Sequence, residues 1–484
     1  MSTPKDEPSI IGTASDAKSP TAPSTSWLPR TLLWVLVAAA ALHASYTYCW
    51  ASFSIVIYLF ALLQLAHAPT WRKAFYPGLA AGLLIGLVRL EFFWRIFSGG
   101  AVMLWMVFAF WIGLFVALAR LCLRWQAPQS RRSYLAWFAI PFVWCGLEYF
   151  RSELYYLRFA WLSPGFAFGA GADYVPLRQL GTYGLGFVLM CLACAGAWVW
   201  RKSRWKAAAI LLAGVGLLRL GGLLGTVSSQ PPTSHSVQVA GVQMEFPTEK
   251  EVLVRLGELI RKHPESELLV LSEYTFTDPV PQKVIDWCRD HRRYLIVGGK
   301  DPLDAGQFFN TAFVISPKGE IVFRQVKSVP IQFFKDGLPA PQQSLWNSPW
   351  GKIGICICYD LSYRRVTDRL VKLGAEALIV PTMDVFDWGT NQHELHARVA
   401  PIRAAEYGIP IFRVASSGIS QVIDRTGREL ATAPCPGDGA IITGTVQVGS
   451  PGRLPLDRWL APFALAVTAL LIMSTAVRRL LARG

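Results

Sequence analysis

The stretch GICICYD (residues 354–360) places two cysteines one residue apart at the end of an apolar run. Such a run predicts a buried strand, in which residues two positions apart face the same side. A thiol deep in a strand is usually an inert core side chain. Because Cys358 directly precedes Tyr359 and Asp360, we expect the strand to end there, with Cys358 as the reactive thiol and Cys356 as the core thiol.

The residues around this stretch, 231–457, have the composition of a soluble domain of roughly 220 residues, large enough to bury a core. Apolar runs predict strands at 236–243, 267–273, 294–300, 309–317, 352–359, 377–383, 409–416, 420–427 and 440–448, with helical patterns at 249–262, 281–291, 362–373 and 391–407. Continuous apolar strands that alternate with helices predict layered α/β packing.

The flanks of this domain are far more apolar. The whole chain is 52% hydrophobic and 16% charged. Runs that span or nearly span a bilayer lie at 32–50, 53–66, 76–96, 101–123, 134–149, 180–200, 205–225 and 459–477. These runs predict a multi-pass α-helical membrane domain (30–226) with about seven transmembrane helices, and a last membrane helix with a basic tail (458–484). Residues 1–29, which precede the first run, predict a disordered tail.

The positive charges of the chain, whose net charge is +15, cluster beside the apolar runs. Alternate connections are basic: HAPTWRKAF (67–75), RWQAPQSRRS (124–133), RKSRW (201–205) and the final RRLLARG (478–484). The positive-inside rule places these segments and both termini in the cytoplasm. Residues 231–457 then face the periplasm from a bacterial inner membrane, and the charge pattern argues against a nucleic-acid partner.

Three segments carry a reactive side chain, two of them at the end of a predicted strand and the third, with Lys327, shortly before a proline. LLVLSEY (268–274) carries Glu273, VFRQVKSVP (322–330) carries Lys327, and the opening stretch carries Cys358. A carboxylate that removes a proton, a thiol that attacks a carbonyl and a cation that stabilises the oxyanion together suit acyl transfer.

These segments, with the long run NQHELHARVAPIRAAEYGIPIFRVASSGISQVIDRTG (391–427), resemble the carbon–nitrogen hydrolase (nitrilase) superfamily over residues 236–448. With apolar runs on both sides, nearly the whole chain resembles the membrane-bound branch of that superfamily, the bacterial apolipoprotein N-acyltransferases. The resemblance implies a nitrilase-like αββα sandwich, a Glu-Lys-Cys triad and no cofactor.

The resemblance also implies a two-step reaction. The nucleophile takes an acyl chain from a phospholipid as a thioester, then passes it to the N-terminal diacylglyceryl cysteine of an apolipoprotein. Glu273 matches the family's general base and Cys358 its nucleophile. Tyr359 and Asp360 match the supporting Tyr-Glu pair, with aspartate in place of glutamate.

The lysine region departs from the family pattern Tyr-x-Lys-x-x-Leu-Val-Pro-Phe-Gly-Glu. Alignment on Val329-Pro330 puts Gln325 at the lysine position and Lys327 two residues later. Strand residues two positions apart lie on one side, about 7 Å apart, so we expect Lys327 to reach the same site. Gln325 offers an uncharged donor instead. The glutamate that ends the family pattern is missing from this sequence, and Asp336 is a candidate to replace its carboxylate.

Arg89, Glu91 and Arg95 lie in an aromatic segment near the outward surface. They either anchor the interface or form a phospholipid headgroup site or an ion pair between two helices. Residues 152–179 predict an interfacial or re-entrant element beside which a lipid enters. HELH (393–396) lacks the zinc spacing, and no metal site is expected.

Two other functions remain open on the sequence alone. One is a membrane-tethered amidase or nitrilase that acts on a small soluble substrate, which would not need the aromatic segment 152–179. The other is a catalytically impaired homologue that acts as a binding protein, because the lysine region is altered.

Overall fold

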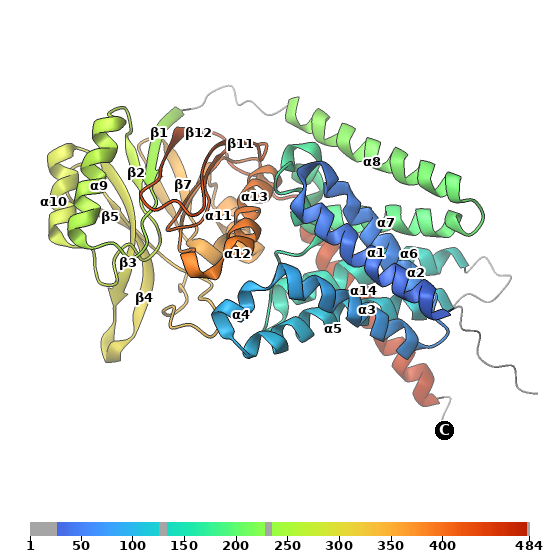
Figure 1. The fold of residues 1–484 in the computed structure, drawn as a ribbon. Coiled ribbons are helices and arrows are strands. Elements are labelled where there is room, and N and C mark those ends of the chain that lie inside the picture. Colours follow the sequence, from blue (N-terminus) through green and yellow to red (C-terminus); the bar gives the residue numbers. More distant parts are fainter. Residues whose placement is uncertain (1–26, 125–132, 228–234, 482–484) are drawn as a thin grey trace, which may run out of the picture.

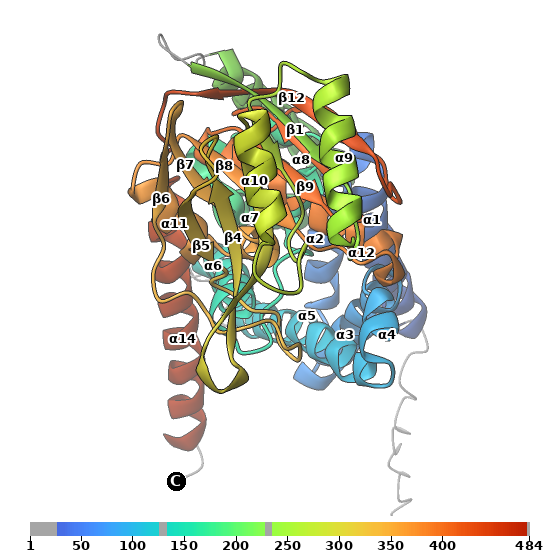
Figure 2. The same ribbon diagram turned by 90° about the vertical axis from the view of Figure 1, so that its left-hand side faces the viewer.

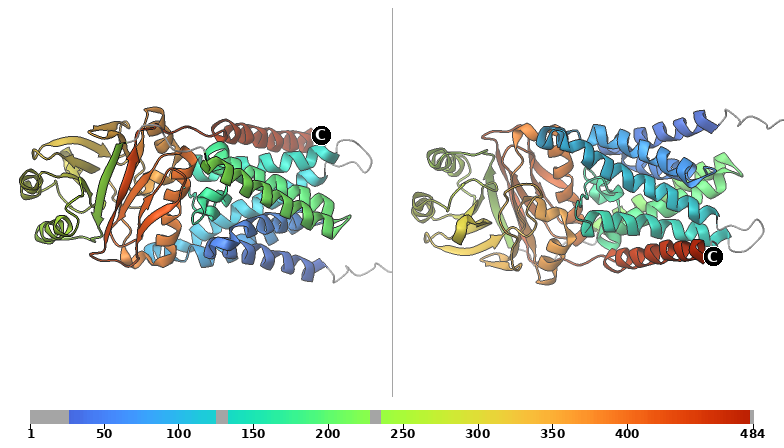
Figure 3. Two further views of the ribbon diagram at one scale, coloured as in Figure 1. Left: turned by 90° about the horizontal axis from the view of Figure 1, so that it is seen from above. Right: turned by 90° about the horizontal axis from the view of Figure 1, so that it is seen from below.

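The computed structural model describes residues 27–124, 133–227 and 235–481. An α/β sandwich and a helical domain lie end to end in it (Figure 1, Figure 3). Most of the predicted tail lies outside the described residues, and helix α1 begins before its predicted boundary, at Trp27. The described part of the chain therefore has the predicted fold class, a helical membrane domain joined to a nitrilase-like sandwich.

Within these residues, five helices are long and apolar enough to cross a membrane. They are α1 (Trp27–Thr47), α5 (Gly100–Arg124), α7 (Leu177–Trp200), α8 (Arg204–Val227) and α14 (Asp457–Leu481). Each coincides with a predicted apolar run. The runs at 53–66 and 134–149 form shorter helices, α2 (Ile55–Leu65) and α6 (Ser133–Tyr149).

The predicted single span at 76–96 is wrong. Helix α3 (Trp71–Arg89) ends and the short helix α4 (Phe92–Phe97) begins after a break at Leu90. The Nε1 of Trp105 on α5 donates to the Leu90 carbonyl at 2.8 Å, which satisfies a carbonyl group at the helix end. The charged end of the predicted span therefore belongs to a separate helix.

The sandwich consists of two six-stranded sheets. In order across the first sheet lie β12 (Ile441–Val448), β1 (His235–Val242), β2 (Leu268–Val270), β3 (Tyr294–Pro302), β4 (Phe308–Ile315) and β5 (Ile321–Val326). The second contains β11 (Glu429–Ala433), β10 (Ser420–Ile423), β9 (Ile411–Ala415), β8 (Ala377–Thr382), β7 (Gly351–Ile355) and β6 (Leu345–Ser348). The strands missed by the sequence, β5, β6 and β11, are all edge strands with few buried side chains, which weakens their apolar signal.

Helices cover both outer faces of the sandwich. Helices α9 (Glu249–Lys262) and α10 (Gln282–His291) pack on the first sheet and face the viewer in Figure 2. Helices α11 (Arg364–Lys372) and α13 (Val399–Tyr407) pack on the second. The predicted helix 391–407 is split at Arg398 into α12 (Thr390–Ala397) and α13.

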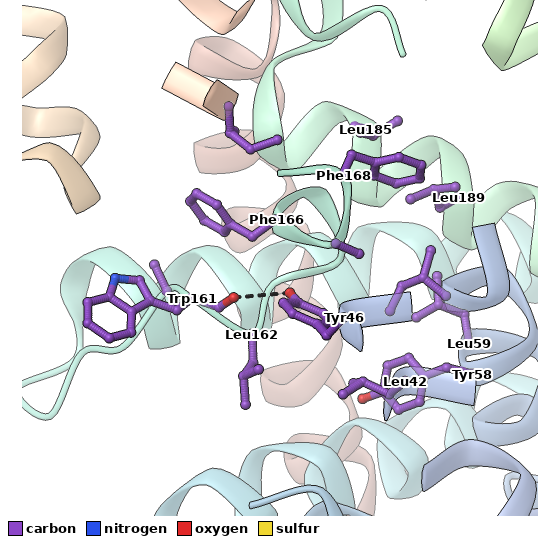
Figure 4. Close-up of a cluster of buried hydrophobic side chains, with 14 of the residues drawn as sticks. Leu42, Tyr46, Tyr58, Leu59, Trp161, Leu162, Phe166, Phe168, Leu185 and Leu189 are labelled. Carbon is purple, nitrogen blue, oxygen red and sulfur yellow. Dashed lines mark hydrogen bonds between the residues drawn. The ribbon is translucent and has the colours of Figure 1, made fainter. Parts of the chain in front are cut away.

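The helical layer under the second sheet also packs against the membrane helices. Side chains of α11 and α13 belong to the same buried cluster as those of α1, α2 and α7. Residues 152–179 lie in this region and begin in a π-helical turn (Phe150–Leu154), continue as irregular chain with short 3₁₀ turns, and end in the first turn of α7. Phe166 and Phe168 are buried there (Figure 4). The Tyr46 hydroxyl donates to the Trp161 carbonyl at 3.0 Å. The two domains thus share one core.

Ionic contacts at the start of α14 join the domains as well. Arg458 forms ion pairs with Asp368 of α11 at 2.6 Å and with Glu406 of α13 at 2.7 Å. The neighbouring Asp457 accepts a hydrogen bond from the backbone N–H of Tyr183 in α7 at 2.9 Å. One turn of α14 therefore holds the sandwich against a membrane helix.

Candidate active site

Cys358 lies just beyond the end of β7, in a 3₁₀ turn that runs from Cys358 to Ser362. The predicted strand 352–359 is too long: β7 ends at Ile355, and Cys358 has a φ of 51°. This conformation is uncommon for residues other than glycine, and such residues cluster at functional sites. The turn separates the two cysteines, because Cys358 packs between the sheets whereas Cys356 packs toward the membrane helices. The expectation that both face the same side of a strand is wrong.

Asp360 holds this turn in place. Its carboxylate accepts hydrogen bonds from the backbone N–H groups of Ser328 at 3.0 Å, Val329 at 2.7 Å and Ile357 at 3.3 Å. Asp360 therefore ties the cysteine turn to the loop that follows Lys327. Burial raises the pKa of this carboxyl to about 6, although Lys327 and the three N–H groups favour the charged form.

Glu273 follows β2 and is 1% exposed. Its Oε1 accepts from the Lys327 Nζ at 2.8 Å and from the Asn310 Nδ2 at 2.6 Å. Its Oε2 accepts from the Met383 backbone N–H at 2.9 Å. These contacts hold the carboxylate near the Cys358 thiol, which donates to the Met383 carbonyl at 3.6 Å.

Lys327, and not Gln325, contacts this carboxylate. The lysine is fully buried just after β5, and its Nζ lies 2.7 Å from the Asp336 Oδ2 as well as 2.8 Å from Glu273. Gln325 is buried away from the site, where its side chain donates to the Val326 carbonyl and accepts from the Ser344 N–H. Burial opposes a charge on Lys327, but Glu273 and Asp336 raise its pKa well above the usual value.

Asp336 and Asn310 complete the surroundings of the lysine. Asp336 accepts from the Tyr274 hydroxyl at 2.9 Å, from Asn310 at 2.9 Å and from the Ile331 N–H at 2.7 Å. Burial alone would raise its pKa, yet the Lys327 ammonium keeps it below the usual value. Asn310 carries no sequence signal of its own. Only the pairing of β4 with β5 brings it against residue 327.

Burial, and then the Glu273 carboxylate, raise the pKa of the Cys358 thiol well above its usual value, and Lys327 only partly offsets this. The thiol is therefore protonated at rest and has a proton acceptor near it. Such an arrangement suits a nucleophile that is deprotonated as it attacks.

A second buried cluster, missed in the sequence analysis, lies near the thiol. Asp384 contacts the His396 Nδ1 at 2.7 Å and the Arg413 Nη2 at 2.5 Å. The His396 ring stacks on Trp161 at 4.8 Å and lines the same pocket as Cys358. Burial lowers the pKa of His396, which favours the neutral ring. His393 faces Cys435 instead, at 2.7 Å, so the HELH histidines have separate surroundings.

Cys358 opens into a pocket of about 470 Å³, lined mostly by aromatic and apolar side chains of α4 and the 331–334 loop. It adjoins a second pocket of about 670 Å³, and Phe93, Phe97, Ile331 and Tyr359 line both. The second pocket continues along α5, at Leu104, Val107, Phe108 and Trp111. An apolar space therefore leads from the thiol to a membrane helix, and residues 157–159 of the segment 152–179 border it.

The predicted lipid-facing residues lie apart from the thiol. Arg89 is 6% exposed and donates to the His43 carbonyl and the Thr47 hydroxyl of α1. Arg95 pairs with Glu91 at 3.3 Å, and both side chains are well exposed. The ion pair is thus present, but within one helix rather than between two.

Two family models match the chain. Residues 25–195 match the apolipoprotein N-acyltransferase N-terminal domain, and residues 256–454 match carbon-nitrogen hydrolase. An apolipoprotein N-acyltransferase of Shewanella oneidensis is 23% identical over 89% of this chain and 93% of its own. A second, from Bordetella bronchiseptica, is 25% identical over 76% of this chain and 80% of its own.

Two solved structures are similar to part of the chain. The nitrilase-superfamily protein Nit3 of Saccharomyces cerevisiae covers 45% of this chain and 93% of its own, with 19% identity and a TM-score of 0.39. A carbon-nitrogen hydrolase of Helicobacter pylori covers 49% of this chain and 93% of its own, with 18% identity and a TM-score of 0.39.

Proposed function

Because the chain belongs to the apolipoprotein N-acyltransferase family, we propose that it moves an acyl chain from a membrane phospholipid, through a thioester on Cys358, to the N-terminal diacylglyceryl cysteine of an apolipoprotein. The observation that carries this proposal is the meeting of Glu273, Lys327 and Cys358 at the end of an apolar space that reaches α5. A small soluble amide would not need that space.

In the first step, Glu273 takes the proton of the Cys358 thiol as the sulfur attacks an ester carbonyl of the phospholipid. The Lys327 ammonium stabilises the negative charge that develops on the carbonyl oxygen. When the intermediate collapses, the C–O bond breaks. Glu273 returns its proton to the leaving alkoxide, and a lysophospholipid departs.

In the second step, the neutral α-amino group of the acceptor attacks the thioester. Glu273 takes a proton from the nitrogen, the C–S bond breaks, and the proton returns to the sulfur of Cys358. The products are an amide and the resting thiol. Asp336 and Asn310 act as positioning residues, because they hold Lys327 and Glu273 in place.

The decisive experiment uses purified full chain and phosphatidylethanolamine with a labelled acyl chain. We expect hydroxylamine-sensitive label on the wild type and on Cys356→Ala, and none on Cys358→Ala. Addition of a diacylglyceryl-cysteine peptide should move the label to the peptide in a hydroxylamine-resistant form. Unlabelled wild type, or label that survives Cys358→Ala, would refute the proposal.

The proposed orientation places the sandwich in the periplasm. It is supported by the α2–α3 and α7–α8 connections, which lie on the far side of the helical domain from the sandwich (Figure 1). In sequence, the basic residues Arg72, Lys73, Arg201 and Lys202 lie in or next to these connections. Cys49 is exposed just after α1, on the sandwich side. An impermeant maleimide should label Cys49 in cells with a permeabilised outer membrane, but not a cysteine introduced as Arg201→Cys. Labelling of the introduced cysteine but not of Cys49 would show that the sandwich faces the cytoplasm.

A further inference from the structure

Two arginines share one aromatic ring at the border between the sandwich and the helical domain. The guanidinium of Arg158, from the segment after α6, lies 5.4 Å from the centre of the Tyr363 ring. That of Arg365, in the first turn of α11, lies 5.9 Å from the same ring. Cation–π contact stabilises each guanidinium but does not neutralise it.

The carboxylates of Glu153 and Asp360 favour the charge of Arg365 without forming an ion pair with it. Across the described residues, neither guanidinium forms an ion pair or a side-chain hydrogen bond, and the Arg158 Nε is buried without a partner. Burial and the neighbouring charge of Arg158 lower the pKa of Arg365. The fully buried arginines Arg403 and Arg413 are paired with carboxylates, whereas Arg158 is half-buried and Arg365 is exposed. Of the latter two side chains, only Arg158 has a buried donor without a partner, its Nε, and such a donor is costly.

The backbone at Arg158 is fixed in place. The hydroxyls of Tyr359 and Tyr363 both donate to the Arg158 carbonyl, each at 3.3 Å. The two tyrosine rings pack edge to face, 4.9 Å apart. The side chain of Arg158 therefore extends from a rigid point, which is what a preformed anion site requires.

Arg158 lines the apolar pocket that continues along α5, and Tyr359 lines both that pocket and the one that contains Cys358. A half-buried cation therefore borders the apolar space that reaches the thiol, and Arg365 lies against the same tyrosine ring as Arg158. A phospholipid likewise carries a phosphate close to its esters and acyl chains.

We propose that Arg158 and Arg365 bind the phosphate of the phospholipid donor and thereby direct its ester to Cys358. The guanidinium groups would each donate hydrogen bonds to the phosphate oxygens, which supplies the missing partner of the Arg158 side chain and relieves the repulsion between the two cations. This subsite rests on the proposed acyl transfer, whose donor it specifies.

The first test compares Arg158→Gln and Arg365→Gln with Arg369→Gln, which removes the same charge from an exposed position one turn further along α11. Acylation of Cys358 is measured with phosphatidylethanolamine and with diacylglycerol of the same chains. We expect the two site variants to raise the half-saturating phosphatidylethanolamine concentration about tenfold. Their rates with diacylglycerol, and both activities of Arg369→Gln, should be unchanged. An equal loss with both donors, or no loss, would overturn the proposal.

The second test does not require acyl transfer. Full-length Cys358→Ala protein is titrated calorimetrically with dihexanoylphosphatidylglycerol below its micelle concentration, and with inorganic phosphate. We expect the short lipid to bind more tightly than phosphate and to lose about tenfold in affinity when Arg158→Gln is added. Such binding, together with a wild type that forms no thioester in the first test, would refute the proposed function alone. Equal binding of inorganic phosphate would assign the site to free phosphate, and binding unaffected by Arg158→Gln would refute the site.

Discussion

Lys327 and Glu273 form an ion pair that water does not reach. The Nζ and Oε1 atoms lie 2.8 Å apart, and the two side chains are 0% and 1% exposed. Asp336 contacts the same ammonium at 2.7 Å, so two carboxylates share one cation beside the Cys358 thiol. The cluster carries one excess negative charge, which explains why the thiol holds its proton until a substrate arrives.

Lys327→Gln should lower the rate of thioester formation on Cys358 by about 10²–10³-fold, because the oxyanion loses the cation proposed to stabilise it. Gln325→Ala and Lys335→Ala are the matched controls. Gln325 is buried outside the site and Lys335 is exposed, and both variants should acylate at nearly the wild-type rate. Rapid acylation of Lys327→Gln would mean that another residue stabilises the oxyanion.

Glu273→Gln should separate reactivity of the thiol from acylation. The Glu273 carboxylate raises the pKa of Cys358, so its neutral replacement lowers that pKa and increases the thiolate fraction near pH 8. We expect faster iodoacetamide alkylation of Cys358, followed by mass spectrometry of its peptide, together with loss of acyl transfer. Slower alkylation in Glu273→Gln would show that the carboxylate activates the resting thiol instead.

Asp360→Asn should change the pH dependence of stability. Burial raises the pKa of Asp360 from 3.8 to about 6, so the native state binds more protons than the unfolded state between these values. The contribution of this group therefore favours folding below pH 4 and is lost as the pH rises through 6. The melting temperature of the wild type, relative to Asp360→Asn, should fall over this range. A relative melting temperature that rises with pH would contradict the raised pKa.

Gly181→Ala should weaken the attachment of α14 to α7. Gly181 has a φ of 73°, and a Cβ there would lie 2.3 Å from the Asp457 carboxylate. We expect a loss of about 1–3 kcal/mol, seen as a lower melting temperature. Gly216→Ala on α8 is the control, since nothing lies within 4 Å of its Cβ position. A stable Gly181→Ala protein would show that α7 and Asp457 adjust freely.

Much of the fold was predictable because its signals are local. Long apolar runs marked the membrane helices, and helix α9 was predicted with the bounds 249–262 that the structure gives. Predictions failed where a strand buries few side chains or where a helix breaks inside a long hydrophobic segment. The edge strands β5, β6 and β11 bury too few side chains to produce a strand signal, and the break at Leu90 lies inside the segment 76–96, which its length and composition made a single span.

By itself, the sequence determined the two-domain architecture and marked Glu273 and Cys358, because both are reactive side chains that follow buried apolar runs. It did not determine which of Gln325 and Lys327 meets Glu273, nor that Asn310, Asp336 and His396 lie near the site. Those contacts depend on how strands and loops distant in sequence pair and pack. Only the tertiary structure also separates the two cysteines of GICICYD, because the chain leaves β7 at Ile355 and turns Cys358 toward Glu273.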